Sequence, residues 1–497
     1  MTDTATLDAA PAALQLHPRD DVAVALRPVA AGEAIEGVAA LQPIEQGHKI
    51  ALHDLRAGDA VRKFGWPIGR MKADARAGEH VHSHNLETLL SGVEGYAYQP
   101  VSGEALPQST GSFMGYRRAD GRVGTRNEIW ILPTVGCVGR TAQRIADQSA
   151  RRHEGRVDGI HAFSHPHGCS QLGGDLAGTR ALLAALACHP NAAGVLIVGL
   201  GCEENQLKQL LAAIPEELHG RIRSLGAQSV EDELETGLAL VDELVEMAAQ
   251  VQRTPADLSD LVLGLKCGGS DGFSGLTANP LVGRMADRVA GGGGTAILSE
   301  IPEIFGAERL LMARARDEQV FGGIVEVVND FKRYFIDHGE PISENPSPGN
   351  VAGGITTLEE KSLGAVQKAG QAPVEDVLRY AERVRRKGLT LLEAPGNDAV
   401  SSTALAAAGA TVILFTTGRG TPLGFPVPTV KIASNSGLAT RKAGWIDFDA
   451  GQVLRDGMEP AADAMLDKIL AVASGEPTAA EKNGEREIAI WKRGVTL

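Results

Sequence analysis

The sequence predicts a multidomain protein in which a small all-β unit is followed by α/β units with mostly parallel sheets. Its 497 residues exceed the size of one ordinary domain and suggest about three. The first part of the chain consists of short strand-like runs separated by turns. The later part alternates buried apolar runs with helical runs, a layout typical of parallel sheets covered by helices.

The composition is that of an ordinary globular protein, with 43% hydrophobic and 22% charged residues. The net charge of −14 is spread along the chain without a basic stripe, so we expect neither nucleic-acid nor membrane binding. No window approaches 18 apolar residues, and the N-terminus lacks the pattern of a signal peptide. Five widely spaced cysteines do not suggest a disulfide framework, and we expect a cytoplasmic protein.

A leader, a β unit and a linker are expected in the first part of the chain. Residues 1–14 are rich in alanine and are expected to be disordered. Residues 15–90 contain the phrases AAGEAI, RAGDAV and RAGEHV, each a turn before a strand, which predicts a compact all-β domain. Residues 91–115 are polar and contain several prolines and glycines, which indicates a linker.

Three histidines mark the last strand expected in the β unit. His80, His82 and His84 alternate along this strand, and alternate strand residues share one face. Three imidazoles on one face suit metal binding or proton transfer. We therefore expect the β unit to fold back over the site, with His82 and His84 in it. The alternative is a unit that serves assembly, with its histidines in solvent.

Two α/β units are expected in the rest of the chain. Residues 116–255 alternate strands and helices and close with the long helical run VEDELETGLALVDELVEMAAQV. Residues 256–497 open with the apolar strand LVLGLKC and alternate again. They also contain the irregular stretch NPSPGNVAGGITTLEEKSLG and a loop that carries Glu300 and Glu303. Long loops in compact domains are usually functional, so we expect these to form walls of a site.

Four of the five cysteines follow directly on an expected strand, and these are Cys137, Cys169, Cys202 and Cys267. If their strands share one sheet, the thiols converge on one edge and suit a metal site, since thiolates favour iron over magnesium. The alternative is four unrelated buried thiols after glycine turns. The fifth cysteine, Cys188, lies in a helical run and is expected to pack in the core.

Candidate acids and bases lie beside these cysteines. His165 and His167 precede Cys169, while Lys266 and Asp271 flank Cys267. Each side chain could accept or donate a proton, and the sequence does not say which is the base and which the acid.

Several polar residues are candidates for binding an anionic substrate. They are Arg126, Asn127, Ser270, Asn397, Ser401, Ser402 and Arg419. The two arginines lie in Gly-rich loops and could clamp a carboxylate, unless they are simply solvated. The serines open a predicted helix whose free amides could hold an anion, unless the motif is an ordinary N-cap. Phosphate loops and a complete dinucleotide fingerprint are missing from the sequence, which argues against NAD or ATP.

The chain resembles the family of sugar-acid dehydratases that includes altronate and galactarate dehydratases. The resemblance is carried by the blocks GEHVHSHN, NEIWILPTVGC, SHPHGCSQLG, GLGCEENQ, CGGSDGFSGLTANP, ENPSPGNVAGGITTLEEKSLG and APGNDAV, in this order. It implies that the N-terminal β unit is a SAF domain of the β-clip type. It further implies an iron-dependent cytoplasmic lyase of hexuronate catabolism.

The reaction implied by the resemblance is dehydration of D-altronate to 2-dehydro-3-deoxy-D-gluconate by β-elimination. The cofactor implied is Fe²⁺, as a single ion or in an iron–sulfur cluster, with Mn²⁺ as a substitute. The expected ligands are His82, His84, Cys137, Cys169, Cys202 and Cys267. The alternatives are a galactarate dehydratase or another sugar-acid lyase and, more remotely, a sensor that binds metal or sugar acid without turnover. The sequence leaves the oligomeric state open, and a homodimer is compatible with it.

Overall fold

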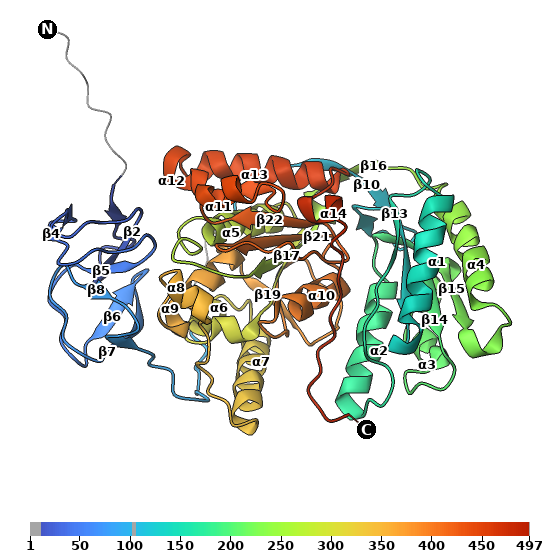
Figure 1. Cartoon of the computed structure of the whole chain (residues 1–497), viewed down its shortest axis with the longest axis horizontal. Helices are drawn as coiled ribbons and strands as arrows, with labels where there is room; N and C mark the ends of the chain where they lie inside the picture. Colours follow the sequence, from blue (N-terminus) through green and yellow to red (C-terminus); the bar gives the residue numbers. More distant parts are fainter. Residues whose placement is uncertain (1–10, 102–105, 497) are drawn as a thin grey trace, which may run out of the picture.

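The computed structural model describes residues 11–101 and 106–496 and shows three bodies arranged in a row. The small β unit lies at one end, a unit built on a seven-stranded sheet lies in the middle, and a unit built on a four-stranded sheet lies at the other end (Figure 1). This is the predicted class, a β unit followed by α/β units with parallel sheets. No helix in the described ranges is long and apolar enough to cross a membrane.

The β unit consists of short antiparallel strands. They are β1 (Ala13–Leu14), β2 (Val22–Ala25), β3 (Ala34–Ile35), β4 (Val38–Ala39), β5 (Lys49–Ala51), β6 (Ala60–Lys63), β7 (Trp66–Met71), β8 (His80–Val81) and β9 (Leu86–Glu87). They form the sheets β1-β2-β5-β8, β6-β7-β9 and β3-β4. The first strand lies inside the expected leader, because Ala13 is buried and pairs with Ala25. Residues 1–10 of that leader lie outside the described residues.

The four-stranded unit alternates parallel strands and helices. In chain order these are β12 (Glu128–Pro133), α1 (Gly139–Arg152), β13 (Gly159–Ala162), α2 (Gly173–Ala187), β14 (Ala192–Gly199), α3 (Leu207–Ala212), β15 (Ile222–Gly226) and α4 (Glu233–Ala248). The strand order is β13-β12-β14-β15. Ile129 and Ile131 pack with residues of α1 and α4, while Trp130 and Leu132 pack with α2 on the other face. Burial on both faces explains the continuous apolar run of β12.

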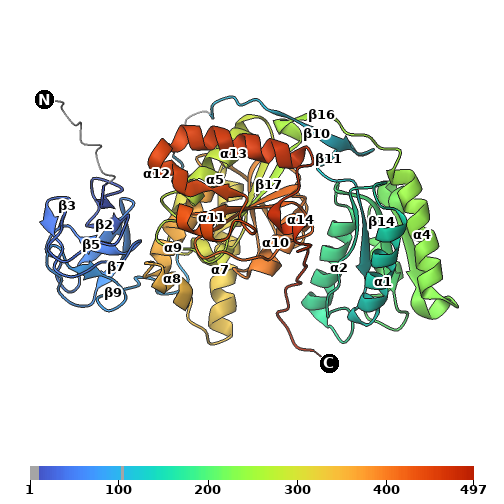
Figure 2. The same cartoon turned by 45° about the horizontal axis from the view of Figure 1, so that its top comes forward.

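The central unit carries the seven-stranded sheet, ordered β19-β20-β18-β17-β21-β22-β23. Its elements are β17 (Val262–Cys267), α5 (Ala278–Gly291), β18 (Thr295–Leu298), α6 (Glu308–Met312), α7 (Glu318–Asp337), α8 (Pro348–Ala352), α9 (Leu358–Ala365), β19 (Val374–Leu378), β20 (Gly388–Leu392), α10 (Asp398–Ala408), β21 (Val412–Thr417), β22 (Thr429–Ala433), α11 (Ser436–Arg441), β23 (Phe448–Asp449), α12 (Val453–Asp456), α13 (Met458–Ala473) and α14 (Ala479–Lys482). Helices α5 and α13 pack together over the sheet, as Figure 2 shows.

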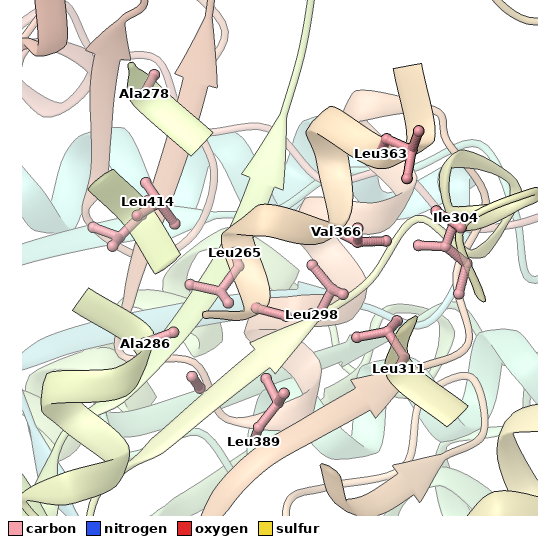
Figure 3. Packing of buried hydrophobic residues seen from close by; sticks show 14 of the residues in the cluster. Leu265, Ala278, Ala286, Leu298, Ile304, Leu311, Leu363, Val366, Leu389 and Leu414 are labelled. Atoms are coloured by element: carbon pink, nitrogen blue, oxygen red, sulfur yellow. The ribbon is translucent and has the colours of Figure 1, made fainter. Parts of the chain in front are cut away.

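The core of the central unit extends into the β unit. Leu265, Leu298 and Leu414 of the sheet pack with aliphatic side chains of the surrounding helices (Figure 3). Val61 and Ile68 of the β unit belong to the same buried cluster. The two units therefore share one continuous core.

The expected linker and the boundary before the central unit are both more ordered than the sequence suggested. Strand β10 (Ser112–Arg117) begins within the expected linker and pairs with β11 (Val123–Gly124) and with β16 (Thr254–Asp257). Tyr96, also in the linker, donates a hydrogen bond to Glu308 of the central unit. The expected linker is thus held by backbone pairing and by side-chain contacts, neither of which its polar composition predicted.

The four-stranded and seven-stranded units meet at a buried histidine. His189 lies beside the ring of Trp130, donates from Nε2 to the carbonyl of Ala410 at 3.1 Å, and accepts at Nδ1 from the backbone of Asn191. Burial lowers the pKa of His189 to about 3, so its ring is neutral at physiological pH.

We expect His189 to make this interface sensitive to acid. Because its pKa is depressed in the folded chain, the unfolded state alone binds its proton below about pH 6.5. As the pH is lowered below about 6.5, the contribution of this residue should therefore decrease the free energy of unfolding by about 1.4 kcal/mol per pH unit. Urea unfolding of wild type and His189→Gln, followed by tryptophan fluorescence, should show their difference shrinking between pH 6.5 and pH 4. A constant difference over this range would contradict the expectation.

Candidate active site at the carboxyl edge of the seven-stranded sheet

The central sheet has a topological switch at β17. The chain passes from β17 to β18 on one side and later crosses to β21 on the other. Ligands of open α/β sheets bind at such points, outside the carboxyl ends of the strands. The loops that follow β17, β18, β20, β21 and β22 all lie at this edge, because these strands are parallel.

A thiol and two carboxylates form the centre of this edge. Cys267 Sγ lies 3.1 Å from Glu303 Oε2, and the backbone N–H of Cys267 donates to Glu300 at 3.0 Å. One ligand atom from each of the three residues lies within 4.8 Å of the other two, and all three residues are buried. Glu300 has a left-handed backbone with φ of 66°, which is uncommon for a residue other than glycine.

Lys266 connects this centre to the first residue of α10. Its ammonium is fully buried and forms ion pairs with Glu300 and, at 2.9 Å, with Asp398. Burial lowers the pKa of Lys266, but the carboxylates of Glu300 and Asp398 outweigh it and raise the pKa above its usual value. These two carboxylates therefore favour the ammonium form of the side chain.

Two more lysines reach the centre from the segment that follows β18. Lys361 donates to Glu303 at 2.9 Å, and Lys368 donates to Glu300 at 2.8 Å. With Lys266, they place three ammonium groups around two carboxylates. The site is thus buried yet strongly charged, which is typical of sites that stabilise developing negative charge.

The donor set fits a divalent metal ion. Burial, together with the carboxylates of Glu300 and Glu303, raises the pKa of the Cys267 thiol to about 12, although Lys368 and Lys266 oppose the shift. Such a thiol becomes a thiolate when a metal displaces its proton. A thiolate with two carboxylates within 4.8 Å of one another is an ordinary transition-metal donor set.

Asp271 organises the loop after β17. Its carboxylate accepts hydrogen bonds from the hydroxyls of Ser274 and Ser434 at 2.9 Å each, and from the amide of Asn435 at 3.1 Å. Burial raises its pKa, although these bonds oppose the shift. A side chain at Gly418 would lie 2.2 Å from its carboxyl carbon. Asp271 is therefore held tightly in place and positions the loops around it.

An open hollow of about 390 Å³ adjoins Asp271. Its wall includes Arg419 after β21, Arg441 at the end of α11, and Gln46 from the β unit. Both arginines are exposed and form no ion pair with a residue in the described ranges. The hollow is large enough for a small anion, and its guanidinium groups suit a carboxylate.

The β unit docks directly on these loops. The backbones of Gly47, Gly272 and Gly354 approach so closely that a Cβ at Gly272 or Gly354 would lie 2.2 or 2.3 Å from the Gly47 oxygen. Lys49 and Lys63 of the β unit donate to the buried carboxylate of Glu360 at 2.9 and 2.8 Å. The unit therefore covers part of the carboxyl edge, as the sequence analysis predicted for its position.

The histidines of the β unit gather, but not on one strand. Strand β8 ends at Val81, and His82 and His84 lie in the turn that follows. The rings of His80, His82 and His84 nevertheless lie near one another, with centroid distances of 5.1 and 5.5 Å from His80. The ring of His48, which the sequence analysis missed, lies 4.9 Å from that of His82.

His82 faces the central unit, and both His80 and His82 are held in neutral form. His82 Nε2 lies 3.1 Å from the carbonyl of Val351, just before the hollow wall at Ala352. Burial lowers the pKa of His80 to about 3 and that of His82 to about 4. Neutral imidazole is the form that binds metal ions, so these values are compatible with the predicted role.

The other three predicted cysteines lie on the four-stranded sheet. Cys137, Cys169 and Cys202 follow β12, β13 and β14, which are neighbours in that sheet. Cys137 and Cys169 line one hollow of about 520 Å³, together with His165. Within the described ranges, their sulfur atoms do not form a group of three within 4.8 Å. The structure thus places Cys267 on a different sheet from the other three thiols.

The predicted acid–base residues are divided in the same way. His165 donates from Nε2 to Pro133 at 2.9 Å and accepts at Nδ1 from the backbone of His167 at 3.2 Å. Burial lowers the pKa of His165 to about 4. Both histidines lie in the four-stranded unit, whereas Lys266 and Asp271 lie at the central carboxyl edge.

Two of the predicted substrate-binding residues are occupied by structural contacts. Arg126 uses all five of its N–H donors, two of them on Glu481 and the others on backbone carbonyls. Asn127 accepts from Arg118 and donates to the carbonyl of Ala248. The Gly-rich loop favoured a guanidinium free to bind a carboxylate, but this loop is buried between the two α/β units, and its donors are used within the protein.

The serine-rich helix start is also largely structural. Asn397 caps α10 by accepting from two backbone N–H groups of its first turn. Ser401 and Ser402 are fully buried, and the Ser401 hydroxyl donates back to the Asn397 carbonyl at 2.8 Å. The ordinary N-cap alternative therefore describes this motif. Ser270 is buried beside Asp271, and its carbonyl accepts from Asn350.

Lys361 and Lys368 are not among the residues predicted for the site from sequence. They are seven residues apart, two helical turns, and so lie on one face of the segment that begins with α9. This spacing could have indicated them. No comparable pattern in the sequence indicated Arg441 or Gln46, because each reaches the hollow from an element that is distant in sequence from Asp271.

The fold and this edge define a multidomain α/β protein with a buried thiol–carboxylate–ammonium centre beneath an N-terminal β unit. Three family models match the chain in order. That of the altronate/galactarate dehydratase SAF domain matches residues 11–89. That of the D-galactarate dehydratase/altronate hydrolase second domain matches residues 115–249, and that of the D-galactarate/altronate dehydratase C-terminal domain matches residues 258–496.

Curated relatives agree over almost the full length. The chain is 50% identical to altronate dehydratase of Escherichia coli, over 97% of this chain and 99% of the relative. It is 48% identical to altronate dehydratase of Bacillus subtilis, again over 97% of this chain and 99% of the relative. It is 33% identical to galactarate dehydratase (L-threo-forming) of Escherichia coli, over 93% of each chain. The chain belongs to the altronate/galactarate dehydratase family.

Proposed function

We propose that this protein is a hydro-lyase that converts D-altronate to 2-dehydro-3-deoxy-D-gluconate and water. One observation carries the choice of substrate: identity to two altronate dehydratases is 50% and 48%, against 33% to a galactarate dehydratase. A panel of aldonic and aldaric acids, assayed anaerobically with ferrous iron, tests this choice. The largest kcat/KM is expected for D-altronate, and a larger value for galactarate would overturn it.

The proposed reaction is a β-elimination. A base removes the proton at C2, the C3–O bond breaks, and the departing hydroxide takes up a proton to leave as water. The resulting enol becomes the 2-keto acid. Negative charge accumulates on the substrate carboxylate and C2 as the proton leaves, so cations must lie there beforehand.

The residues at the carboxyl edge support these requirements. Arg419 and Arg441 would bind the substrate carboxylate in the hollow beside Asp271. Lys266 stays protonated because of Glu300 and Asp398, and its ammonium would stabilise the charge formed at C2. The complete burial of Lys266 would keep competing water from its ammonium group.

We propose Fe²⁺ as the cofactor, with Cys267, Glu300 and Glu303 as ligands. The buried thiol and carboxylates fit an iron ion better than magnesium, and we propose Mn²⁺ as a substitute. When bound, such an ion acts as a Lewis acid toward the substrate carboxylate. His82 and His84 remain predicted as ligands or proton carriers. The thiols of Cys137, Cys169 and Cys202 remain predicted ligands of iron, as an ion or a cluster.

The iron content of cysteine variants distinguishes Cys267 from the thiols of the four-stranded unit as ligands of the metal. We expect Cys267→Ala to lose its iron and to lower kcat by at least about 100-fold, because a metal ligand at the reacting centre is removed. Iron content and turnover of Cys267→Ala and Cys169→Ala, purified anaerobically, provide the comparison. Cys188→Ala is the control, since that thiol is buried in the core. Full iron and full turnover in Cys267→Ala would remove Cys267 from the site.

Arg419 should act mainly on binding. We expect Arg419→Ala to raise KM for D-altronate about tenfold or more and to change kcat less, since it would lose one charge-assisted contact to the carboxylate. Steady-state kinetics of Arg419→Ala measures this. The exposed Arg455, which pairs with Asp456, provides the control variant Arg455→Ala. An unchanged KM in Arg419→Ala would place the substrate elsewhere.

We also propose that the protein acts in the cytoplasm. All five cysteines lie in the described ranges and none forms a disulfide, which is the state expected in a reducing compartment.

A further inference from the structure

A second and larger cavity lies at the opposite edge of the central sheet. It has a volume of about 900 Å³ and is lined by residues of both α/β units. Val262, Thr295 and Thr411 in its wall stand at or just before the first residues of β17, β18 and β21. Cys267 ends β17, so this cavity lies about 17 Å from the candidate active site at the rise of an extended strand. It is therefore a separate site.

One wall of the cavity is flat and apolar. Ala181, Ala184 and Ala185 of α2 and Ala408 of α10 contribute methyl groups only, and Cys188 lies beside them. Because these four lining side chains end at Cβ, no group projects from this part of the wall. A surface of this kind suits a flat apolar group rather than a polyhydroxy chain.

The mouth of the cavity is rich in cations. Five basic residues line it, namely Arg122, Arg383, Arg385, Arg386 and Lys387. Two of the five are neutralised: Arg122 pairs with Asp120, and Arg385 pairs with Asp376.

The remaining cations lack acidic partners. Arg383 and Arg386 form no ion pair with any residue in the described ranges, and Lys387 donates only to the carbonyl of Ser259. Glu217 is the one acidic lining residue of the described chain that has no cationic partner, and its single charge offsets only one of these three cations.

A further guanidinium close to the mouth adds to the excess of charge. Arg221 donates to the carbonyl of His189 at 3.1 Å, and its buried Nε has no hydrogen-bond partner among the described residues. Burial lowers its pKa to about 10, and repulsion from Arg122 and Arg383 acts in the same direction. Asp120, the partner of Arg122, opposes this shift, whereas Arg221 and Arg383 have no ion-pair partner in the described ranges and would attract an anion.

We propose that this cavity binds a phosphate ester with a flat apolar part, of the nucleoside-phosphate class. Its phosphate would contact Arg383 and Arg386, and its apolar part would lie on the alanine wall. Arginine suits phosphate because its planar donors form paired hydrogen bonds with two oxygens. The sugar-acid substrate offers no flat apolar part and therefore fits this cavity poorly.

Calorimetric titration of the full chain with AMP tests the proposal. We expect one AMP bound per chain, with an affinity that falls as salt is added, since the contacts are between charged groups. The double variant Arg383→Ala/Arg386→Ala should bind AMP at least tenfold more weakly. Arg144→Ala on α1 is the matched control, because Arg144 is exposed, unpaired within the described ranges and outside the cavity lining.

Two further titrations examine the apolar wall and the separateness of the site. Ala181→Leu places a larger side chain on the wall and should weaken AMP while leaving inorganic pyrophosphate unchanged. Saturating D-altronate should not displace AMP. The proposal is overturned if AMP shows no saturable binding, if the double variant binds it as tightly as wild type, or if D-altronate competes with it. None of these readouts depends on dehydratase activity.

Discussion

Replacing Lys266 by methionine is expected to lower kcat for D-altronate by at least about 100-fold, with a smaller change in KM. Loss of one preorganised charge at a developing anion typically costs that much. The ammonium of Lys266 is fully buried and is fixed by Glu300 and Asp398, so water cannot replace it. Steady-state kinetics of the iron-loaded enzyme measures the effect.

A second buried lysine controls for the loss of a buried charge as such. Lys431 of β22 lies over the same ring, that of Phe415, at 5.4 Å compared with 5.7 Å for Lys266. Burial lowers the pKa of Lys431 to about 8, and its ammonium donates to the Thr421 carbonyl. Lys431→Met should retain turnover close to wild type. A folded Lys266→Met enzyme with kcat within threefold of wild type would refute the role of Lys266.

Replacing Glu360 by glutamine is expected to destabilise the protein by about 3–5 kcal/mol, the usual cost of removing one partner from a buried ion pair. Glu360 is only 2% exposed and is the shared partner of Lys49 and Lys63, both of them almost fully buried. Two ammonium groups would then remain buried without a counter-charge. Urea unfolding measures the loss, and it should coincide with release of the β unit.

The matched control replaces the whole ionic group. In the variant Lys49→Met/Lys63→Met/Glu360→Leu no charge stays unpaired, so we expect most of the stability to return. Glu33→Gln removes an exposed partner of Arg27 and should leave the stability nearly unchanged, since such pairs are screened by solvent. If Glu360→Gln were as stable as Glu33→Gln, the ion pairs would not hold the β unit in place.

The fold was largely predictable because its signals are local. Continuous apolar runs such as β12 and β17 identify strands buried on both faces, and the helices between them have strong apolar patterns. The pairing of β10 with β16 was not predictable, because Ser112 and Asp257 are joined across 145 residues of chain. A polar segment paired in this way looks like a linker in sequence.

The site was less predictable, since it depends on which strands share a sheet. Four cysteines follow strands, and the sequence alone does not show that Cys137 and Cys267 belong to different sheets. Likewise, the loop around Arg126 resembles a ligand-binding loop, and only its burial against Glu481 shows that its donors are used. Both the sheet to which a cysteine belongs and the burial of Arg126 depend on tertiary structure, which residue type alone does not indicate.

Anomalous scattering at the iron absorption edge most directly tests the claim that the reaction occurs at the carboxyl edge of the seven-stranded sheet. Crystals of the full chain would be grown anaerobically with ferrous iron and D-altronate. We predict an iron peak bounded by Cys267, Glu300 and Glu303, with the sugar-acid carboxylate against Arg419. Iron found only among Cys137, Cys169 and Cys202, with the sugar acid beside it, would contradict the account.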